Sequence, residues 1–126
     1  MKKKYLIVED SLFIRELYRI CLKDVELELV GEIGDGATAI QKINELNPDI
    51  VLLDLVLPEK SGFDVLSECA KLNTKFVIIS SLPSADYEPK AKALGALFYL
   101  EKPFKKQQLI ETVEMAIHTL SEARHG

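Results

Sequence analysis

The sequence predicts an α/β protein, a doubly wound (βα)5 fold with a five-stranded parallel sheet. Five short apolar runs alternate with segments whose apolar residues recur at helical spacing, which is the pattern of five strand–helix units. The runs at 50–53 and 76–79 are apolar throughout, as strands covered by helices on both faces are. A chain of 126 residues suffices for one domain, and 48% hydrophobic with 29% charged residues is typical of a globular protein.

The first two strand–helix units occupy the N-terminal part of the chain. Residues 5–8 form a compact apolar run that stops at two acids, and Ser11 is the candidate N-cap of the next helix. That helix is predicted from apolar residues at helical spacing, namely Leu12, Phe13, Leu17 and Cys21. Residues 27–33 alternate between polar and apolar side chains, which predicts a strand near an edge of the sheet. The second helix, over 37–46, ends at Asn47-Pro48 because the residue before a proline disfavours helix.

The third and fourth units contain the two most apolar strands. Residues 50–54 and 76–80 are the predicted strands, and a helix over 63–72 connects them. The fourth helix ends at Gly95, but Pro89 falls inside the expected segment, where proline removes a hydrogen-bond donor and clashes with the preceding turn. We therefore expect this helix to begin near Pro89 or to be irregular before it.

The fifth unit completes the predicted domain. Residues 97–100 form the last strand, and the helix over 105–121 carries one apolar stripe. The stripe consists of Leu109, Val113, Ala116, Ile117 and Leu120. We expect one domain over 1–121, followed by a frayed tail over 122–126.

The charge and the cysteine content limit the classes of binding partner and indicate the cellular compartment. The net charge of −4 and the pI of about 5.2 give no general attraction to nucleic acid. No apolar run approaches the ~20 residues of a membrane-spanning helix, and the charged N-terminus is not a signal peptide because its apolar stretch stops at acids. Cys21 and Cys69 stand apart from any cysteine or histidine cluster, which predicts buried or half-buried thiols in a reducing cytoplasm.

Polar side chains stand where the predicted strands end. They are Glu9 and Asp10 after the first strand, Asp54 at the end of the third, Ser80 at the end of the fourth and Lys102 after the fifth. The carboxyl ends of the strands form the ligand-binding edge of an open α/β sheet, so we expect these side chains to converge. Three carboxylates in one cleft repel one another, and a hard divalent cation such as Mg²⁺ relieves that conflict. Together with an ammonium and a hydroxyl, such a site suits a phosphoryl group.

Four segments at these strand ends resemble the receiver domain of two-component response regulators. They are Leu6-Ile7-Val8-Glu9-Asp10, Asp54-Leu55-Val56-Leu57-Pro58-Glu59-Lys60-Ser61-Gly62, Val77-Ile78-Ile79-Ser80-Ser81 and Tyr99-Leu100-Glu101-Lys102-Pro103-Phe104. The resemblance spans residues 2–120. It implies the flavodoxin-like receiver fold and a role in phosphorelay signal transduction.

The resemblance implies a phosphorylation and metal site. Asp54 would be the phosphoacceptor. Glu9 and Asp10, together with Asp54 and the backbone carbonyl of Val56, would hold Mg²⁺, for which Mn²⁺ can substitute. The domain would be a phosphoprotein that acts on no external substrate, and therefore not an enzyme.

The resemblance also implies a switch. Lys102 would contact the phosphoryl group, Ser80 would be the switch hydroxyl and Tyr99 the switch aromatic residue. Pro103 would follow a cis peptide bond. Phosphorylation adds charge and acceptor oxygens, Ser80 would move to bond one of them, and Tyr99 would turn inward. The surface made by the fourth helix, the fifth strand and the fifth helix would then change shape.

The implied partners are proteins. The phosphoryl group would come from a sensor histidine kinase or a phosphotransfer protein, and the signal would pass to a downstream protein or to an output domain outside this chain. A homodimer through the surface of the fourth helix, fifth strand and fifth helix is a further expectation, whereas membrane and direct nucleic-acid binding are not expected. Val56 and Leu82, two residues beyond Asp54 and Ser80, cannot orient water, so we expect slow self-dephosphorylation.

Other interpretations of the same residues stay open. Taken singly, Asp54 could cap a helix, Lys102 could be a solvated surface lysine, and Tyr99 could be a packing residue. An aspartate-nucleophile phosphatase would usually carry a second acid where this chain has Val56, and a nucleotide-binding domain would need a glycine-rich loop after the first strand. The sequence does not decide between a stand-alone receiver and the receiver of a longer protein.

Overall fold

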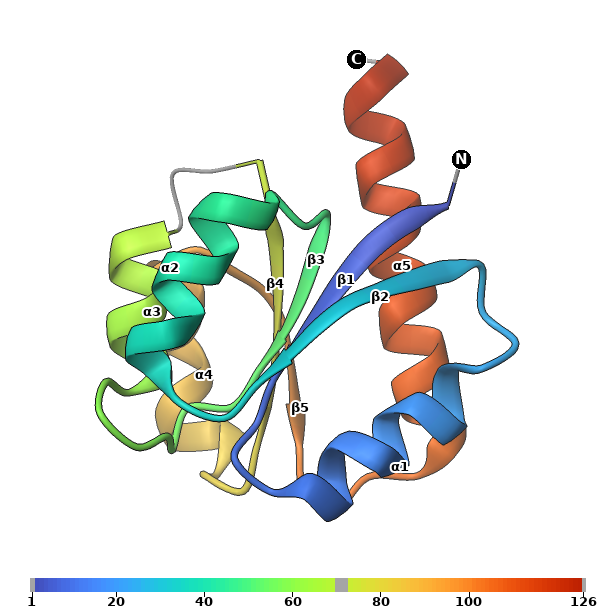
Figure 1. Ribbon diagram of the computed structural model, residues 1–126. Helices are drawn as coiled ribbons and strands as arrows, with labels where there is room; N and C mark the ends of the chain where they lie inside the picture. The colour runs from blue at the N-terminus through green and yellow to red at the C-terminus, as the bar shows by residue number, and fades with distance from the viewer. Residues whose placement is uncertain (1, 70–72, 126) are drawn as a thin grey trace.

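Five strands lie side by side in one parallel sheet (Figure 1). The computed structural model describes residues 2–69 and 73–125. The strands are β1 (Lys3–Val8), β2 (Leu27–Ile33), β3 (Ile50–Leu53), β4 (Lys75–Ser80) and β5 (Ala96–Glu101). Their order is β2-β1-β3-β4-β5, which places β3 in the centre and β2 at an edge. The predicted doubly wound sheet and the edge position of 27–33 are therefore confirmed.

Helices cover both faces of this sheet. They are α1 (Leu12–Leu22), α2 (Gly36–Leu46), α3 (Gly62–Cys69), α4 (Ser84–Ala93) and α5 (Lys106–His125). In Figure 1, α1 and α5 lie on one side of the sheet and α2, α3 and α4 on the other. None of the helices in the described part of the chain is both long enough and apolar enough to cross a lipid bilayer.

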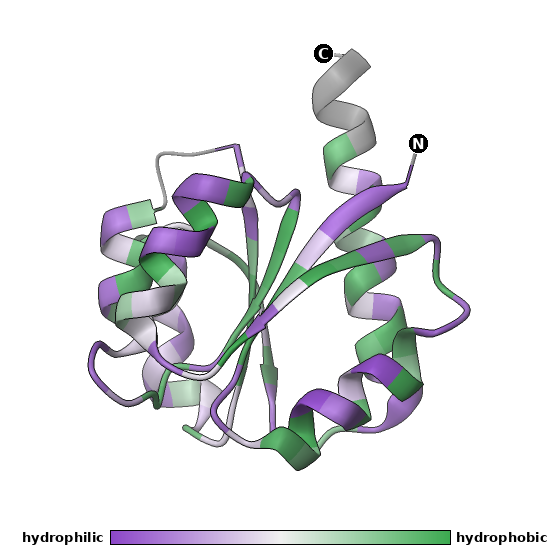
Figure 2. Cartoon of the chain, viewed as in Figure 1, coloured by the Kyte–Doolittle hydropathy of each residue, from purple (hydrophilic) through white to green (hydrophobic). Residues whose placement is uncertain are grey.

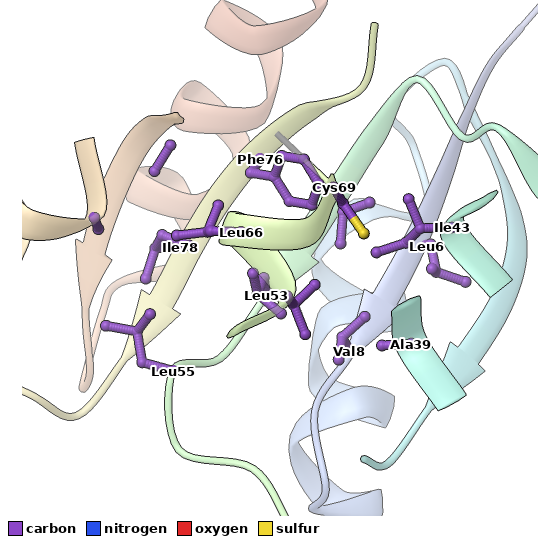
Figure 3. Close-up of a cluster of buried hydrophobic side chains, with 14 residues drawn as sticks. Leu6, Val8, Ala39, Ile43, Leu53, Leu55, Leu66, Cys69, Phe76 and Ile78 are labelled. Atoms are coloured by element: carbon purple, nitrogen blue, oxygen red, sulfur yellow. The ribbon is translucent and has the colours of Figure 1, made fainter. Parts of the chain in front are cut away.

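Two layers of apolar side chains hold the helices to the sheet. Successive residues of a strand point to opposite faces, so Leu6 and Val8 enter the layer beneath α2, α3 and α4, which we call the first layer (Figure 3). Tyr5 and Ile7 enter the second layer, beneath α1 and α5. Figure 2 shows hydrophobic stretches along the central strands, whereas the helices mix hydrophobic and hydrophilic residues. The two cysteines are buried and free, one in each layer, as predicted.

Helix α4 departs from the sequence prediction. It begins at Ser84, five residues before Pro89, rather than near the proline. Pro89 lies on the exposed side, and the first turn is established before it by hydrogen bonds from the amides of Asp86 and Tyr87 to the carbonyl of Pro83. Only one bond of the helical ladder is then lost, and no buried neighbour opposes the ring. Within α4 only Ala91 is buried.

Three further details of the helices bear on the sequence prediction. Leu12 and Phe13 belong to α1 as expected, but they are 74% and 73% exposed, and the helix buries Tyr18 with its neighbours instead. Helix α5 continues to His125, so the predicted frayed tail is helical as far as that residue, because residues 106–125 include no proline or glycine. Helix α3 is described to Cys69, and its predicted end at Leu72 lies outside the described residues.

Candidate functional site

The polar residues at the strand ends gather at the carboxyl edge of the sheet, the lower edge in Figure 1. Glu9 stands two positions after Ile7, and Asp54 stands two positions after Leu52, so both continue the alternation of the second layer. Lys102 follows β5 in the same way. The site is therefore the polar continuation of the apolar layer beneath α1 and α5.

Three carboxylates and one ammonium meet at this edge. One ligand atom each from Glu9, Asp10 and Asp54 lies within 4.8 Å of the others. The Nζ of Lys102 donates to Oε1 of Glu9 at 2.6 Å and to Oδ2 of Asp54 at 2.9 Å. Four of the five side chains that the sequence placed at strand ends are thus in direct reach of one another.

The end of β1 holds Glu9 from two directions. Its backbone amide donates to the carbonyl of Ile33 at 2.9 Å, which extends the pairing of β1 with β2. The amide of Ser11 donates to Oε2 of Glu9 at 3.0 Å, and Oγ of Ser11 in turn accepts the amide of Ile14 as the N-cap of α1. The Glu9 carboxylate is 2% exposed and has a hydrogen bond on each oxygen. Asp10 remains exposed beside it.

The loop after β3 fixes Asp54. The amide of Val56 donates to Oδ1 of Asp54 at 3.1 Å, while Oδ2 accepts from Lys102. Behind the acid, the amide of Gly62 donates to the carbonyl of Leu55 at 2.9 Å. A Cβ at Gly62 would lie 2.3 Å from the carbonyl oxygen of Asp54, so only glycine permits this close packing of α3 against the loop.

Burial makes the electrostatics of the site unusual. Burial raises the pKa of Glu9 to about 7, against the lowering effect of the hydrogen bonds from Lys102 and Ser11. For Lys102 burial acts to lower the pKa, but the hydrogen bonds to Glu9 and Asp54 outweigh it, and its pKa is raised. The ammonium is therefore firmly charged, and it is the nearest counter-charge that the described residues supply to the two carboxylates.

Ser80 and Tyr99 are joined through the backbone of Leu82. Ser80 is fully buried, and its Oγ accepts the amide of Leu82 at 3.3 Å. The half-buried Tyr99 packs against the first layer, and its hydroxyl donates to the carbonyl of Leu82 at 2.6 Å. The sequence predicted the two side chains but not this link, because backbone groups of a loop carry no sequence signature.

An apolar pocket adjoins the charged cluster. It has a volume of about 370 Å³ and lies between α1 and the loop after β5. Its lining is Ile14, Leu17, Ser81, Lys102, Pro103 and Phe104. The peptide bond between Lys102 and Pro103 is cis. Sequence reasoning did not find the pocket, although the apolar positions of α1 that line it belong to the predicted helix.

The donor set fits a small, hard divalent cation. Mg²⁺ favours oxygen ligands in an octahedral shell, a few from protein and the rest from water or phosphate. The carboxylates of Glu9, Asp10 and Asp54 lie close enough together to supply the protein's share. Val56 is next to them through its bond to Asp54, which is compatible with a contribution from its carbonyl.

Comparisons with known proteins give one consistent result. The sequence model of the response regulator receiver domain matches residues 5–114. The chain is 34% identical over 121 residues to the transcriptional regulatory protein PdtaR of Mycobacterium tuberculosis, covering 95% of this chain but only 59% of PdtaR. It is 32% identical over 115 residues to the chemotaxis protein CheY of Thermotoga maritima, covering 90% of this chain and 96% of that protein.

The fold agrees with these sequence matches. The signal receiver domain of a putative Luxo repressor protein from Vibrio parahaemolyticus superposes with a TM-score of 0.92 at 29% identity, over 98% of this chain and 96% of that one. The matched region contains β1 from Tyr5 onward, the other four strands, the carboxylate cluster and Lys102. The chain therefore belongs to the response regulator receiver domain family.

Proposed function

We propose that this receiver domain is a Mg²⁺-dependent phosphoacceptor whose phosphorylated residue is Asp54. The observation that carries the proposal is the joint contact of Lys102 with Glu9 and Asp54 inside a cluster of three carboxylates. A lysine held between two acids provides the fixed positive charge that an arriving phosphoryl group needs. Bound Mg²⁺ supplies further charge neutralisation, and Mn²⁺ can replace it.

The transfer is a displacement at phosphorus. A carboxylate oxygen of Asp54 forms a bond to the phosphorus of a phosphohistidine in a sensor kinase or phosphotransfer protein. The P–N bond breaks, and the imidazole keeps the electron pair and takes up a proton. Asp54 becomes an acyl phosphate, and no substrate outside the signalling chain is consumed.

Ser80, Leu82 and Tyr99 supply a route from the site to the surface. When the Ser80 hydroxyl turns to bond the phosphoryl group, the amide of Leu82 loses its partner, and the loop that holds the Tyr99 hydroxyl is released. The face formed by α4, β5 and α5 then changes shape. The partner that binds this face is a downstream protein, an output domain beyond this chain or a second copy in a homodimer. Separately, the two buried free thiols support a reducing compartment such as the cytoplasm.

The phosphorylation test uses Mg²⁺, acetyl phosphate as a small donor and intact mass measurement. Wild type should gain one phosphoryl group, and Asp54→Ala should gain none. Asp24→Ala removes an exposed acid away from the site and should behave as wild type. Equal labelling of wild type and Asp54→Ala, or labelling without any divalent cation, would contradict the proposal.

We further propose that the acyl phosphate is long-lived. Val56 is 55% exposed above Asp54 and Leu82 is half-buried beside Ser80, and neither side chain can orient or polarise an attacking water. The lifetime of the phosphoryl group at room temperature should therefore be minutes or longer. Intact mass measurements over time, which record the loss of the added mass, give this lifetime. Val56→Asn introduces an amide that can orient water and should shorten the lifetime several-fold. A wild-type lifetime of only seconds would refute this part.

A further inference from the structure

Tyr18 presents a buried hydroxyl that the phosphorylation chemistry does not use. The residue is 1% exposed, and among the described residues its hydroxyl finds no hydrogen-bond partner. Buried hydroxyls are nearly always paired with protein or with ordered water, because leaving one unpaired is costly. The position of this hydroxyl therefore requires an explanation.

Tyr18 lies where the apolar second layer meets the charged site. It is on the buried side of α1, and long helical side chains lean towards the N-terminus of their helix, which here is the end next to Asp10. Its ring centroid is 6.0 Å from that of Phe104, two residues after Lys102. Burial raises the pKa of the Tyr18 hydroxyl, and the charges of Glu9 and Asp54 raise it further, so both carboxylates are within electrostatic range.

Glu9 has the capacity to accept one more hydrogen bond. One oxygen accepts from Lys102 and the other from the amide of Ser11. Each carboxylate oxygen can accept two bonds, so even beside the neighbouring Asp10 carboxylate this side chain, which is nearly inaccessible to bulk solvent, can accept one more.

We propose that the Tyr18 hydroxyl donates, through one buried water, to the Glu9 carboxylate and so fixes the orientation that Glu9 presents to the cation. The water has the hydroxyl and the carboxylate as its two polar partners, the minimum for a stable buried water. Tyr18 is then a positioning residue that acts through Glu9. The inference rests on the proposed function only for the cation, since the proposed link between Tyr18 and Glu9 does not require a bound metal.

The competing explanation makes the opposite prediction for Tyr18→Phe, which removes only the hydroxyl oxygen. If that oxygen were unpaired in an apolar layer, its removal would raise the melting temperature and leave cation binding unchanged. If it holds Glu9 through water, its removal lowers the melting temperature of the metal-free protein and weakens Mg²⁺ binding by about tenfold, the low end for groups that orient metal ligands.

The experiment compares Tyr18→Phe with Tyr5→Phe. Tyr5 is buried in the same layer, but its charged neighbours are Glu32 and Arg19 rather than the site. Amide chemical shifts during a Mg²⁺ titration give the dissociation constant of each variant, and thermal unfolding without metal gives the melting temperatures. A tenfold loss of affinity in Tyr18→Phe alone supports the proposal, and unchanged affinity in that variant overturns it.

Two further readouts keep the test decisive. In wild type with ¹³C-labelled tyrosine, the ring carbon bonded to the Tyr18 hydroxyl should shift on Mg²⁺ addition, and its failure to shift at saturation overturns the proposal. If wild type itself binds no Mg²⁺, the proposed function fails. The Tyr18–Glu9 link is then tested on its own, by comparing the metal-free stabilities of Tyr18→Phe, Glu9→Gln and the double variant. Additive effects in that cycle overturn the link, and non-additive effects support it.

Discussion

Lys102 supplies the counter-charge to two buried carboxylates of the site. Its ammonium contacts Glu9 and Asp54, so two buried carboxylates share one positive charge. Breaking a buried ion pair by removing one partner leaves an uncompensated charge, which costs about 3–5 kcal/mol. A cation or phosphoryl group that draws Lys102 away must therefore replace the contacts that it breaks.

The raised pKa of Glu9 predicts that the stability of the protein depends on pH. Because its pKa is raised from 4.5 to about 7, the folded protein retains a proton that the unfolded chain has already released between these values. The free energy of unfolding of metal-free protein should thus fall as the pH rises from about 5 to 8, with Glu9 contributing no more than about 3 kcal/mol. Urea denaturation across this range measures the slope.

Glu9→Gln is the control for that slope. Glutamine cannot titrate, so the variant should lose this part of the pH dependence, whereas Glu26→Gln, at an exposed position, should keep it. Parallel profiles for wild type and Glu9→Gln would show that Glu9 titrates in its ordinary range.

Among the elements, α4 shows how a helix accommodates an interior proline. Pro89 is the sixth of its ten residues and leaves the carbonyl of Ala85 without its helical donor. The ring faces solvent, and an ion pair of 2.9 Å between Glu88 and Lys92 spans the same turn. The helix therefore forms despite a destabilising proline, and replacing Pro89 should increase the free energy of unfolding.

Pro89→Ala should stabilise the protein by about 1–3 kcal/mol, because alanine restores the amide donor and removes the clash with the preceding turn. Pro83→Ala is the matched control. Pro83 is the N-cap of α4, where a missing amide costs little, so that change should be close to neutral or slightly destabilising. Chemical denaturation of the three proteins measures the differences, and no gain in Pro89→Ala would contradict the argument.

The elements also show what sequence can and cannot predict. The ends of β3 and β4 were predicted to within one residue because apolar runs stop at Asp54 and Ser80. The spacing that predicted α1 did not show which of its apolar residues are buried, since Leu12 and Phe13 fit a helical stripe that tertiary packing leaves exposed. Lys102 was placed in the site, but its simultaneous contacts depend on side-chain geometry that spacing does not encode.

For the molecule as a whole, the site exists only in the folded state. Lys102 lies 48 residues after Asp54 and 93 residues after Glu9 along the chain, and the sheet alone brings the three together. A ligand that binds only the folded form stabilises it by mass action. The proposed cation binding and the free energy of unfolding should therefore be linked.

Mg²⁺ should accordingly raise the melting temperature. At a concentration about a hundredfold above the dissociation constant, the gain should be about 2.7 kcal/mol. Asp10→Asn removes a proposed ligand at an exposed position and should abolish most of the gain without unfolding the protein. Sodium chloride at the same ionic strength is the control, and an equal rise with sodium would show screening rather than a bound cation.

The shallow burial of α4 has a mechanical consequence. Ala91 is its only buried residue, and Tyr87 and Leu94 add partial contacts from its two ends. Peeling this helix from the sheet uncovers little apolar area, so the work required is small compared with the work needed to displace α2 or α3. The surroundings of Asp54 are thus tightly packed, whereas α4 is held by few buried contacts. A small rearrangement near Asp54 can therefore shift α4 while the rest of the fold stays in place.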